Sequence, residues 1–159
     1  MDKLNDGGIL AVQMPLVQNA LFYVLLNRLT AADKWKKLSV IHNFHNLCPN
    51  DTYDILSQIS GDITMWDTSY YHILPSHAAI IEWYKGSGLR PYLEMLNSTE
   101  ETEFLNELLE IIKQKFPYQA DHSVILKMPR LFFTAKKRLP VHRTYFALLL
   151  AVFVSLWLR

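Results

Sequence analysis

The segment spanning residues 66–96 constrains the fold more than any other, because its turn residues fix where a strand ends and a helix begins. Aromatic and β-branched residues from Ile63 to Leu74 predict a strand, which Pro75 ends. Ser76 can cap a helix that runs to Lys85, and Gly86 can end this helix in a left-handed turn. The segment therefore predicts a strand followed directly by a helix.

Hydrophobic periodicity predicts the remaining elements. In order they are a strand at 9–14, a helix at 16–29, a short helix at 52–59, an amphipathic helix at 100–116, and a strand pair or one bent strand at 124–137. The first strand is apolar throughout, so we expect it to be buried with helices on both faces. Asp51 or Thr52 can cap the short helix, and Ser98 opens a capping-box pattern. Pro129 must lie at a bend or an edge, because proline has no N–H to donate.

Composition limits the class of protein. The chain has 159 residues, half of them apolar, which suits one folded domain and excludes disorder over most of its length. A formal net charge of +1 gives no general case for binding nucleic acid or an acidic membrane. The single cysteine, Cys48, excludes an internal disulfide framework and fits a reducing compartment such as the cytoplasm. The polar N-terminus does not read as a signal peptide.

Four stretches of the chain have an unusual composition: GGILAVQMP, TMWDTSYYHILPSHAAIIEWYKGSGLRPYLEML, an acidic helix ending in FP, and MPRLFFTAKK. Together, from Gly7 to Lys137, they resemble the C-terminal half of the trans-aconitate 2-methyltransferase family, S-adenosylmethionine-dependent enzymes of the Rossmann-like class. The resemblance covers about four fifths of the chain. An intact member has a seven-stranded sheet, in which residues 9–14 would be the fifth strand. Residues 63–74 and 131–136 would supply the last two, with one antiparallel strand inserted between its neighbours.

The resemblance implies an α/β fold that contains only the last strands of that sheet, with inserted helices, over residues 1–138. Residues 139–159 are expected to be a separate apolar tail. A cofactor site of this class needs a glycine-rich turn that follows a strand and opens a helix. Gly7 and Gly8 instead precede a strand, and the glycines at 86 and 88 follow a helix. The chain is therefore expected to lack the loop that binds S-adenosylmethionine, and to be inactive alone.

A buried first strand with no earlier strand to pair with would expose an apolar edge. Together with the absent cofactor loop, this indicates a fragment whose expected partner is a missing N-terminal half. A truncated gene, a split gene or a misassigned start would each produce such a chain.

The resemblance also implies methyl ester formation on trans-aconitate, a small tricarboxylic acid. Arg90 is followed by Pro91 and lies in an aromatic-rich segment, so we expect it to fork two hydrogen bonds onto a substrate carboxylate. The alternative is an ion pair with an acid such as Glu94. Gln13 and Met14, at the end of a strand, lie where such sheets place ligands.

Aromatic residues near Arg90 complete the predicted substrate site. Tyr70, Tyr71 and His72 could donate hydrogen bonds to the acid. Because Tyr70 and Tyr71 are adjacent on a strand, their rings point to opposite faces, so one should pack in the core. Trp66 and Trp83 either wall the site or, as large rings more often do, fill the interior.

The histidines have simpler alternatives. His72 and His77 fit surface or capping positions. His42, His45 and Cys48 are three residues apart, which would place them on one helical face. Structural zinc needs four ligands, and no partnered pair is evident. The sequence therefore favours no metal site.

The tail carries an apolar run at 145–158, shorter than the roughly 17 to 25 residues that span a bilayer. It could be a weak membrane anchor, the product of read-through translation, or a helix covering the sheet edge. Three functions thus stay open: part of a carboxyl methyltransferase, a non-catalytic acid-binding or interaction protein, and a membrane-attached protein.

Overall fold

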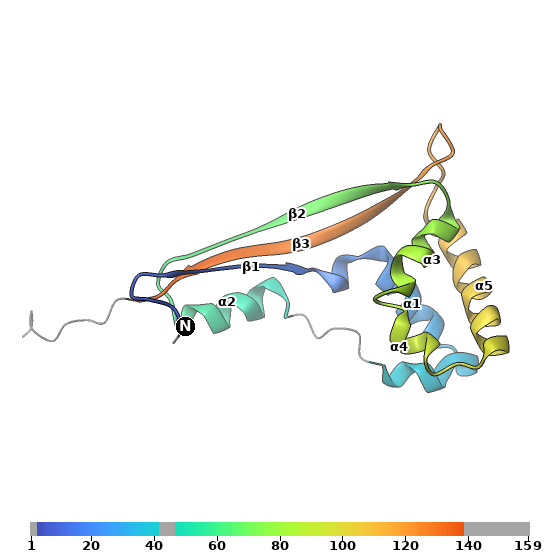
Figure 1. Ribbon diagram of the computed structural model, residues 1–159, viewed down its shortest axis with the longest axis horizontal. Coiled ribbons are helices and arrows are strands. Elements are labelled where there is room, and N and C mark those ends of the chain that lie inside the picture. Colours follow the sequence, from blue (N-terminus) through green and yellow to red (C-terminus); the bar gives the residue numbers. More distant parts are fainter. Residues whose placement is uncertain (1–2, 42–46, 139–159) are drawn as a thin grey trace, which may run out of the picture.

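A computed structural model describes residues 3–41 and 47–138, which form a mixed α/β structure (Figure 1). Its strands are β1 (Ile9–Pro15), β2 (Ile63–Leu74) and β3 (Val124–Lys136). Its helices are α1 (Leu21–Thr30), α2 (Pro49–Ser57), α3 (His77–Lys85), α4 (Arg90–Leu93) and α5 (Ser98–Lys115), with 3-10 turns η1 (Val17–Asn19) and η2 (Asp33–Val40). The expected apolar tail lies outside the described residues.

The three strands form one sheet in the order β1-β3-β2, with β3 antiparallel to both neighbours. β1 and β2 therefore run in the same direction, and the expected insertion of one antiparallel strand between its neighbours is confirmed. β2 pairs with β3 along its whole length, from Ile63 opposite Ala135 to Leu74 opposite Val124. β1 pairs only as far as Pro15. β3 is one continuous strand, so the strand-pair alternative is wrong.

Pro129 lies inside β3, at the point where β1 stops pairing. Its carbonyl accepts a hydrogen bond of 2.9 Å from the backbone N–H of Leu16, just beyond the end of β1. In an antiparallel ladder the N–H and C=O of one residue point to the same neighbour. The donor that proline lacks would therefore point past the end of β1, where no ladder bond is lost.

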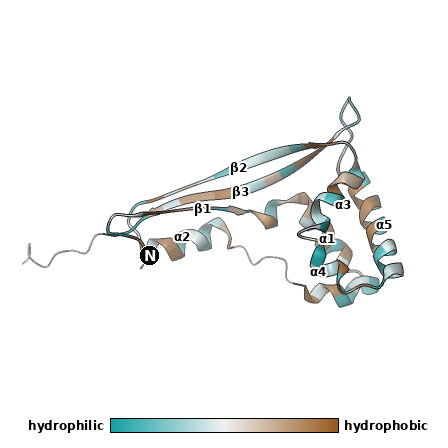
Figure 2. Ribbon diagram, in the orientation of Figure 1, coloured by the Kyte–Doolittle hydropathy of each residue, from teal (hydrophilic) through white to brown (hydrophobic). Residues whose placement is uncertain are grey.

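The two faces of the sheet are covered at opposite ends. Leu131, Phe133 and Ala135 pack in a small core with Leu56 of α2. The side chains of Val124 and Leu126 point to the other face, where they join the main core with α1, α3 and α5. Figure 1 shows these three helices gathered at one end of the sheet and α2 lying toward the other. Hydrophobic residues follow β1 and much of β3, whereas β2 is more hydrophilic (Figure 2).

β1 forms where the sequence predicts it, but none of its residues is buried; exposed and half-buried positions alternate. Leu10, Val12 and Met14 pack from one side onto the small core that contains Leu56. The expectation of a buried strand covered on both faces is therefore wrong. The reason is physical: only one face of β1 meets that core, and within the described residues its outer edge pairs with no strand.

Helix α3 begins as the sequence predicts and ends differently. The Ser76 hydroxyl accepts a hydrogen bond of 3.3 Å from the backbone N–H of Ala79, which confirms it as the cap. Gly86 has a φ of −74°, so the expected left-handed turn is wrong. The chain instead continues in right-handed turns, because two of the N–H groups that follow bond the carbonyl of Tyr84.

Helix α2 begins earlier than predicted. Cys48 is the cap, and its Sγ accepts from the backbone N–H of Asp51 at 3.4 Å. Pro49 takes the first helical position, where its fixed φ suits a helix and no N–H is needed. Asp51 and Thr52, the predicted caps, therefore lie in the first turn.

Helix α5 has the predicted capping box, shifted by one residue. The side chain of Asn97 accepts from the N–H of Glu100 at 3.0 Å, and the Glu100 carboxylate accepts from the N–H of Asn97 at 3.0 Å. Ser98, the predicted cap, is the first helical residue.

Replacing Asn97 with alanine should lower the free energy of unfolding by about 1 kcal/mol, because the first-turn N–H groups lose their acceptor. Urea unfolding measures the change, with Ser98→Ala as the matched control at the neighbouring position. Equal losses in the two variants would show that Asn97 is not the cap.

Candidate functional site

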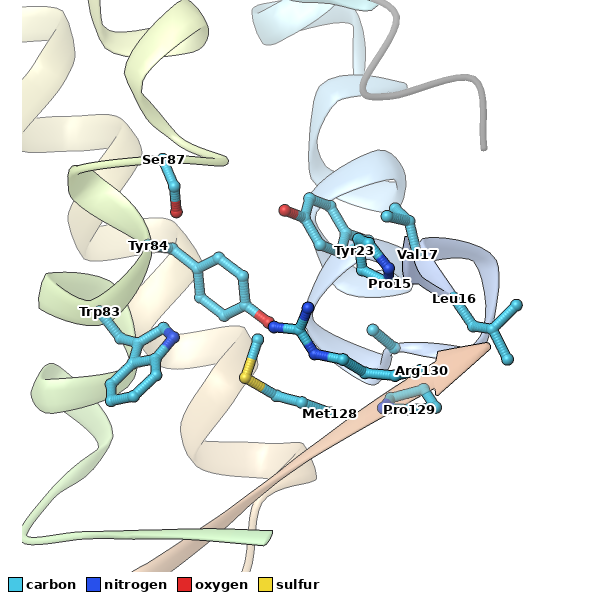
Figure 3. Close-up of a pocket in the computed structure, with 11 residues that line it drawn as sticks. Pro15, Leu16, Val17, Tyr23, Trp83, Tyr84, Ser87, Met128, Pro129 and Arg130 are labelled. Carbon is cyan, nitrogen blue, oxygen red and sulfur yellow. The ribbon is translucent and has the colours of Figure 1, made fainter. Parts of the chain in front are cut away.

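A cavity of about 210 Å³ lies at the C-terminal end of β1, between the sheet and helices α1 and α3 (Figure 3). Ligand sites of α/β sheets commonly lie at this end of the strands. The lining residues come from three segments: Pro15, Leu16, Val17, Ala20 and Tyr23 from the β1–α1 region, Trp83, Tyr84 and Ser87 around the end of α3, and Met128, Pro129 and Arg130 from β3.

Arg130 is the cation of this cavity. It pairs with Pro15 in the sheet, and its half-buried side chain points from β3 across the cavity toward Tyr84 (Figure 3). When the Gln13 amide is oriented with its oxygen toward the guanidinium, that oxygen accepts from Nε at 3.1 Å and from Nη1 at 2.9 Å. Among the described residues, the ion pairs join other groups, and no carboxylate pairs with Arg130. Within the part of the chain that the structure describes, the cavity therefore holds a positive charge without a counter-charge.

Tyr84 supplies a buried hydroxyl to the same cavity. Its ring is 2% exposed, stacks on Phe22 with centroids 3.6 Å apart, and meets the Tyr23 ring edge-on at 5.4 Å. The hydroxyl has no hydrogen-bond partner among the described residues. Burial raises the pKa of Tyr84 far above its usual value, Tyr23 adds to the rise, and Arg130 opposes it. The group is therefore a neutral O–H donor, and a buried donor without an acceptor usually awaits a ligand or water.

Gly88 fixes the position of Tyr23 on the opposite wall. The turn after α3 passes so close to this ring that a Cβ at position 88 would overlap the Tyr23 hydroxyl. Burial raises the pKa of Tyr23 as well, so a second neutral phenol lines the cavity. Gly88, which the sequence places after a helix, thus leaves the Tyr23 ring the space that it occupies.

These groups together suit a small anion. One guanidinium faces neutral hydroxyls, while Trp83, Met128 and Val17 supply apolar walls. The volume is about that of seven water molecules at ~30 Å³ each, which suits a small ligand. Chemically, the cavity can bind one acidic group attached to a short carbon skeleton.

The two predicted tryptophans are not core residues. Trp66 is 46% exposed and stacks on Phe132, with ring centroids 5.4 Å apart. It also borders a second hollow of about 380 Å³. Trp83 is 45% exposed, lines the Arg130 cavity, and lies 4.6 Å from the His72 ring. The interior alternative is therefore wrong for both, because nearly half of each side chain is exposed: Trp66 on the sheet and Trp83 on α3 at the edge of the cavity.

The predicted tyrosines divide between the two faces of β2. Thr68 lies opposite Arg130 in the sheet. Tyr70 and His72 follow Thr68 at intervals of two residues, so their side chains point to the face on which the cavity lies. Tyr71 lies on the other face. Tyr70 is 43% exposed and Tyr71 is 60% exposed, so the expectation that one of them packs in the core is wrong.

Arg90 lies apart from the cavity. It begins α4, and its Nε donates to Oε1 of Glu94 at 2.8 Å, with the two side chains 72% and 62% exposed. The ion-pair alternative is confirmed, and the expected dry pocket around Arg90 is absent from the described residues. His77 is buried, with Nε2 2.7 Å from the carbonyl of Phe116, so the surface expectation for it is wrong.

The expectations about metal binding and about a membrane span involve residues of which the structure describes only some. Within 3–41 and 47–138, no group of three or more His, Cys, Asp or Glu side chains could hold a metal ion. Over the same residues, no helix has the length and hydropathy to cross a bilayer. His42, His45 and the apolar run at 145–158 lie outside the part that the structure describes.

A mixed α/β unit of this topology, with an anion cavity at a strand end, is compatible with part of a methyltransferase fold. No family model matches the chain. The trans-aconitate 2-methyltransferase of Escherichia coli O157:H7 is 34% identical over 139 residues, which are 84% of this chain and 52% of that protein. The enzyme of the same name from Enterobacter sp. (strain 638) is 36% identical over 140 residues, 85% of this chain and 52% of its own length.

The chain therefore spans about half the length of the curated relatives it matches. These matches confirm the resemblance to the C-terminal half of the trans-aconitate 2-methyltransferases.

Stability should fall as the pH rises above about 10. Burial raises the pKa of Tyr23 and Tyr84, and that of Tyr92 to about 12. The folded state thus keeps phenol protons that the unfolded chain releases at the ordinary tyrosine pKa of about 10. The stabilisation that is present below pH ~10 is therefore lost as the pH rises. Urea unfolding at pH 8 and pH 10.5 measures the loss. It should be smaller in Tyr84→Phe than in wild type, whereas Tyr71→Phe, at an exposed ring, should retain the wild-type loss. An undiminished loss in Tyr84→Phe would contradict the assignment.

Proposed function

We propose that this chain is the acceptor-binding part of an S-adenosylmethionine-dependent carboxyl methyltransferase that converts trans-aconitate into a methyl ester. The sequence relation to two proteins named trans-aconitate 2-methyltransferase, over more than four fifths of the chain, carries the proposal. The Arg130 cavity supports it, because a guanidinium is well suited to binding a carboxylate. A cytoplasmic location belongs to the same proposal.

The described residues do not fit the cofactor. A nucleoside-binding turn needs glycines that follow a strand and lead into a helix, so that backbone can approach the ligand closely. The described glycines occupy other places: Gly7 and Gly8 before β1, Gly61 before β2, and Gly86 and Gly88 after α3. β2 itself is followed by Pro75. The proposal therefore assigns this chain no cofactor-binding residue and limits it to the acceptor.

Holding the acceptor is a substantial part of such a reaction. An ionised carboxylate is already a nucleophile, so no strong base is needed. The protein must instead orient the acid and exclude water from it. Arg130 can orient one acidic group, and the Trp83 ring and Met128 wall the same space. A substrate contact of Arg90 remains a prediction.

A second candidate is a non-catalytic acid-binding protein. One observation favours it: the cavity is lined entirely by described residues, while a cofactor turn is absent from them. The two candidates agree on binding and differ on methyl transfer.

A chimera separates them. In it, this chain replaces the corresponding half of the Enterobacter enzyme, and transfer of a labelled methyl group to trans-aconitate is measured. We expect the chimera to transfer the methyl group at a rate at least about tenfold above background, whereas this chain alone should give only background. The parent Enterobacter enzyme, expressed in parallel, is the positive control. A folded chimera that binds the acid without methylating it would favour the non-catalytic candidate.

A further inference from the structure

The geometry points to Arg130 and Tyr84 as the seat of one carboxylate of the acceptor, and specifically of a carboxylate that is not methylated. This assignment rests on the proposed function for the identity of the acceptor, but the seat itself is defined by the cavity. It also replaces Arg90 as the residue to test first.

Arg130 is prepared to receive an anion. With its amide oxygen turned toward the guanidinium, Gln13 accepts from Nε and Nη1 and fixes the plane of the guanidinium from the neighbouring strand. The Nη2 amino group and one hydrogen of Nη1 stay available on the side away from Gln13. Two such N–H groups match the two oxygens of a carboxylate. Gln13 is therefore a positioning residue for Arg130.

Tyr84 completes the seat with a donor that carries no charge. Its hydroxyl is buried and has no hydrogen-bond partner within the described ranges, and Figure 3 shows it at the tip of the Arg130 side chain. A carboxylate between the two groups would satisfy both, removing the cost of an unpaired buried hydroxyl. One guanidinium with neutral hydroxyls balances a single negative charge. The seat therefore suits a carboxylate better than a dianionic phosphate.

The same geometry decides which carboxylate reacts. A carboxylate whose oxygens accept hydrogen bonds from Arg130 and Tyr84 has its negative charge stabilised, so it is a weaker nucleophile than a carboxylate without such donors. Trp83 and Met128 leave an apolar slot for the adjoining carbon atoms. The reacting carboxylate must then lie outside the cavity, on the same molecule. The substrate class is thus a short, flat acid with at least two carboxylates, and a monocarboxylate should bind without being methylated.

Titration calorimetry on the full chain tests the seat with three probes: trans-aconitate, the monocarboxylate crotonate, and inorganic phosphate. Wild type should bind both acids and bind phosphate at least tenfold more weakly. Arg130→Gln should weaken binding of both acids by about tenfold to hundredfold, the usual range for a hydrogen-bonded charge. Arg28→Gln, at an exposed arginine of α1, is the matched control and should bind like wild type.

Tyr84→Phe gives a second test that does not depend on how well Arg130→Gln folds. It removes only an unpartnered hydroxyl, so the melting temperature should not fall. Affinity for both acids should drop about threefold to tenfold. A purely structural role for Tyr84 would leave the affinity unchanged.

The seat is overturned if wild type binds neither acid, if Arg130→Gln or Tyr84→Phe binds like wild type, or if Arg90→Gln loses the affinity instead. Tighter binding of phosphate than of the acids would also overturn it. In the chimera described above, crotonate should inhibit competitively and remain unmethylated; methylated crotonate would contradict the assignment of the reacting group.

Failures of the seat and of the proposed function are distinguishable. An active chimera combined with an Arg130→Gln chain that binds normally removes the seat and leaves the function. An Arg130-dependent affinity in the chain, combined with an inactive but folded chimera, removes the function and leaves the seat.

Discussion

The pairing of β3 with β2 along their full length is the constraint on which the described structure depends. Because side chains alternate across a strand, this one register sends Leu131, Phe133 and Ala135 toward α2 and sends Val124 and Leu126 toward the larger helical core. A shift of one residue would exchange these two sets and place apolar side chains in water. The same register carries Arg130 to the face on which α1 and α3 lie.

The cavity exists because β1 is shorter than the strand it pairs with. β1 ends at Pro15. The N–H of Leu16 then donates one further hydrogen bond to β3, to the carbonyl of Pro129, before the chain turns away from the sheet through η1. Beyond that point β3 has a partner on one side only, and the space is closed by Tyr23, Tyr84 and Trp83 instead of a strand. Arg130, which pairs with Pro15 at the last position of β1, projects its side chain from one face of the sheet into this volume.

Local patterns predicted the elements well and the site less well. Strand and helix periodicity located β2, α3 and α5, and helix caps were found to within a few residues, because caps depend on nearby atoms. Arg90 and Arg130 are each next to a proline, and sequence alone favoured the former for its aromatic neighbours. The choice between the two arginines depends on the strand register. The register places Arg130 near Tyr84, which lies 46 residues earlier in the chain. The exposure of Trp66 likewise depends on which part of the sheet the helices leave uncovered.

The position of β3 in the sheet also determines when this structure can form during synthesis. Ile9 finds its partner at Lys136, and β2 pairs with the same late strand, so neither has a partner until nearly the whole described chain has left the ribosome. Sheets closed by such distant segments fold slowly, because loop closure must precede the contacts that reward it. In the nascent chain, β1 and the aromatic strand β2 emerge as unpaired edges, the kind of surface that chaperones shield.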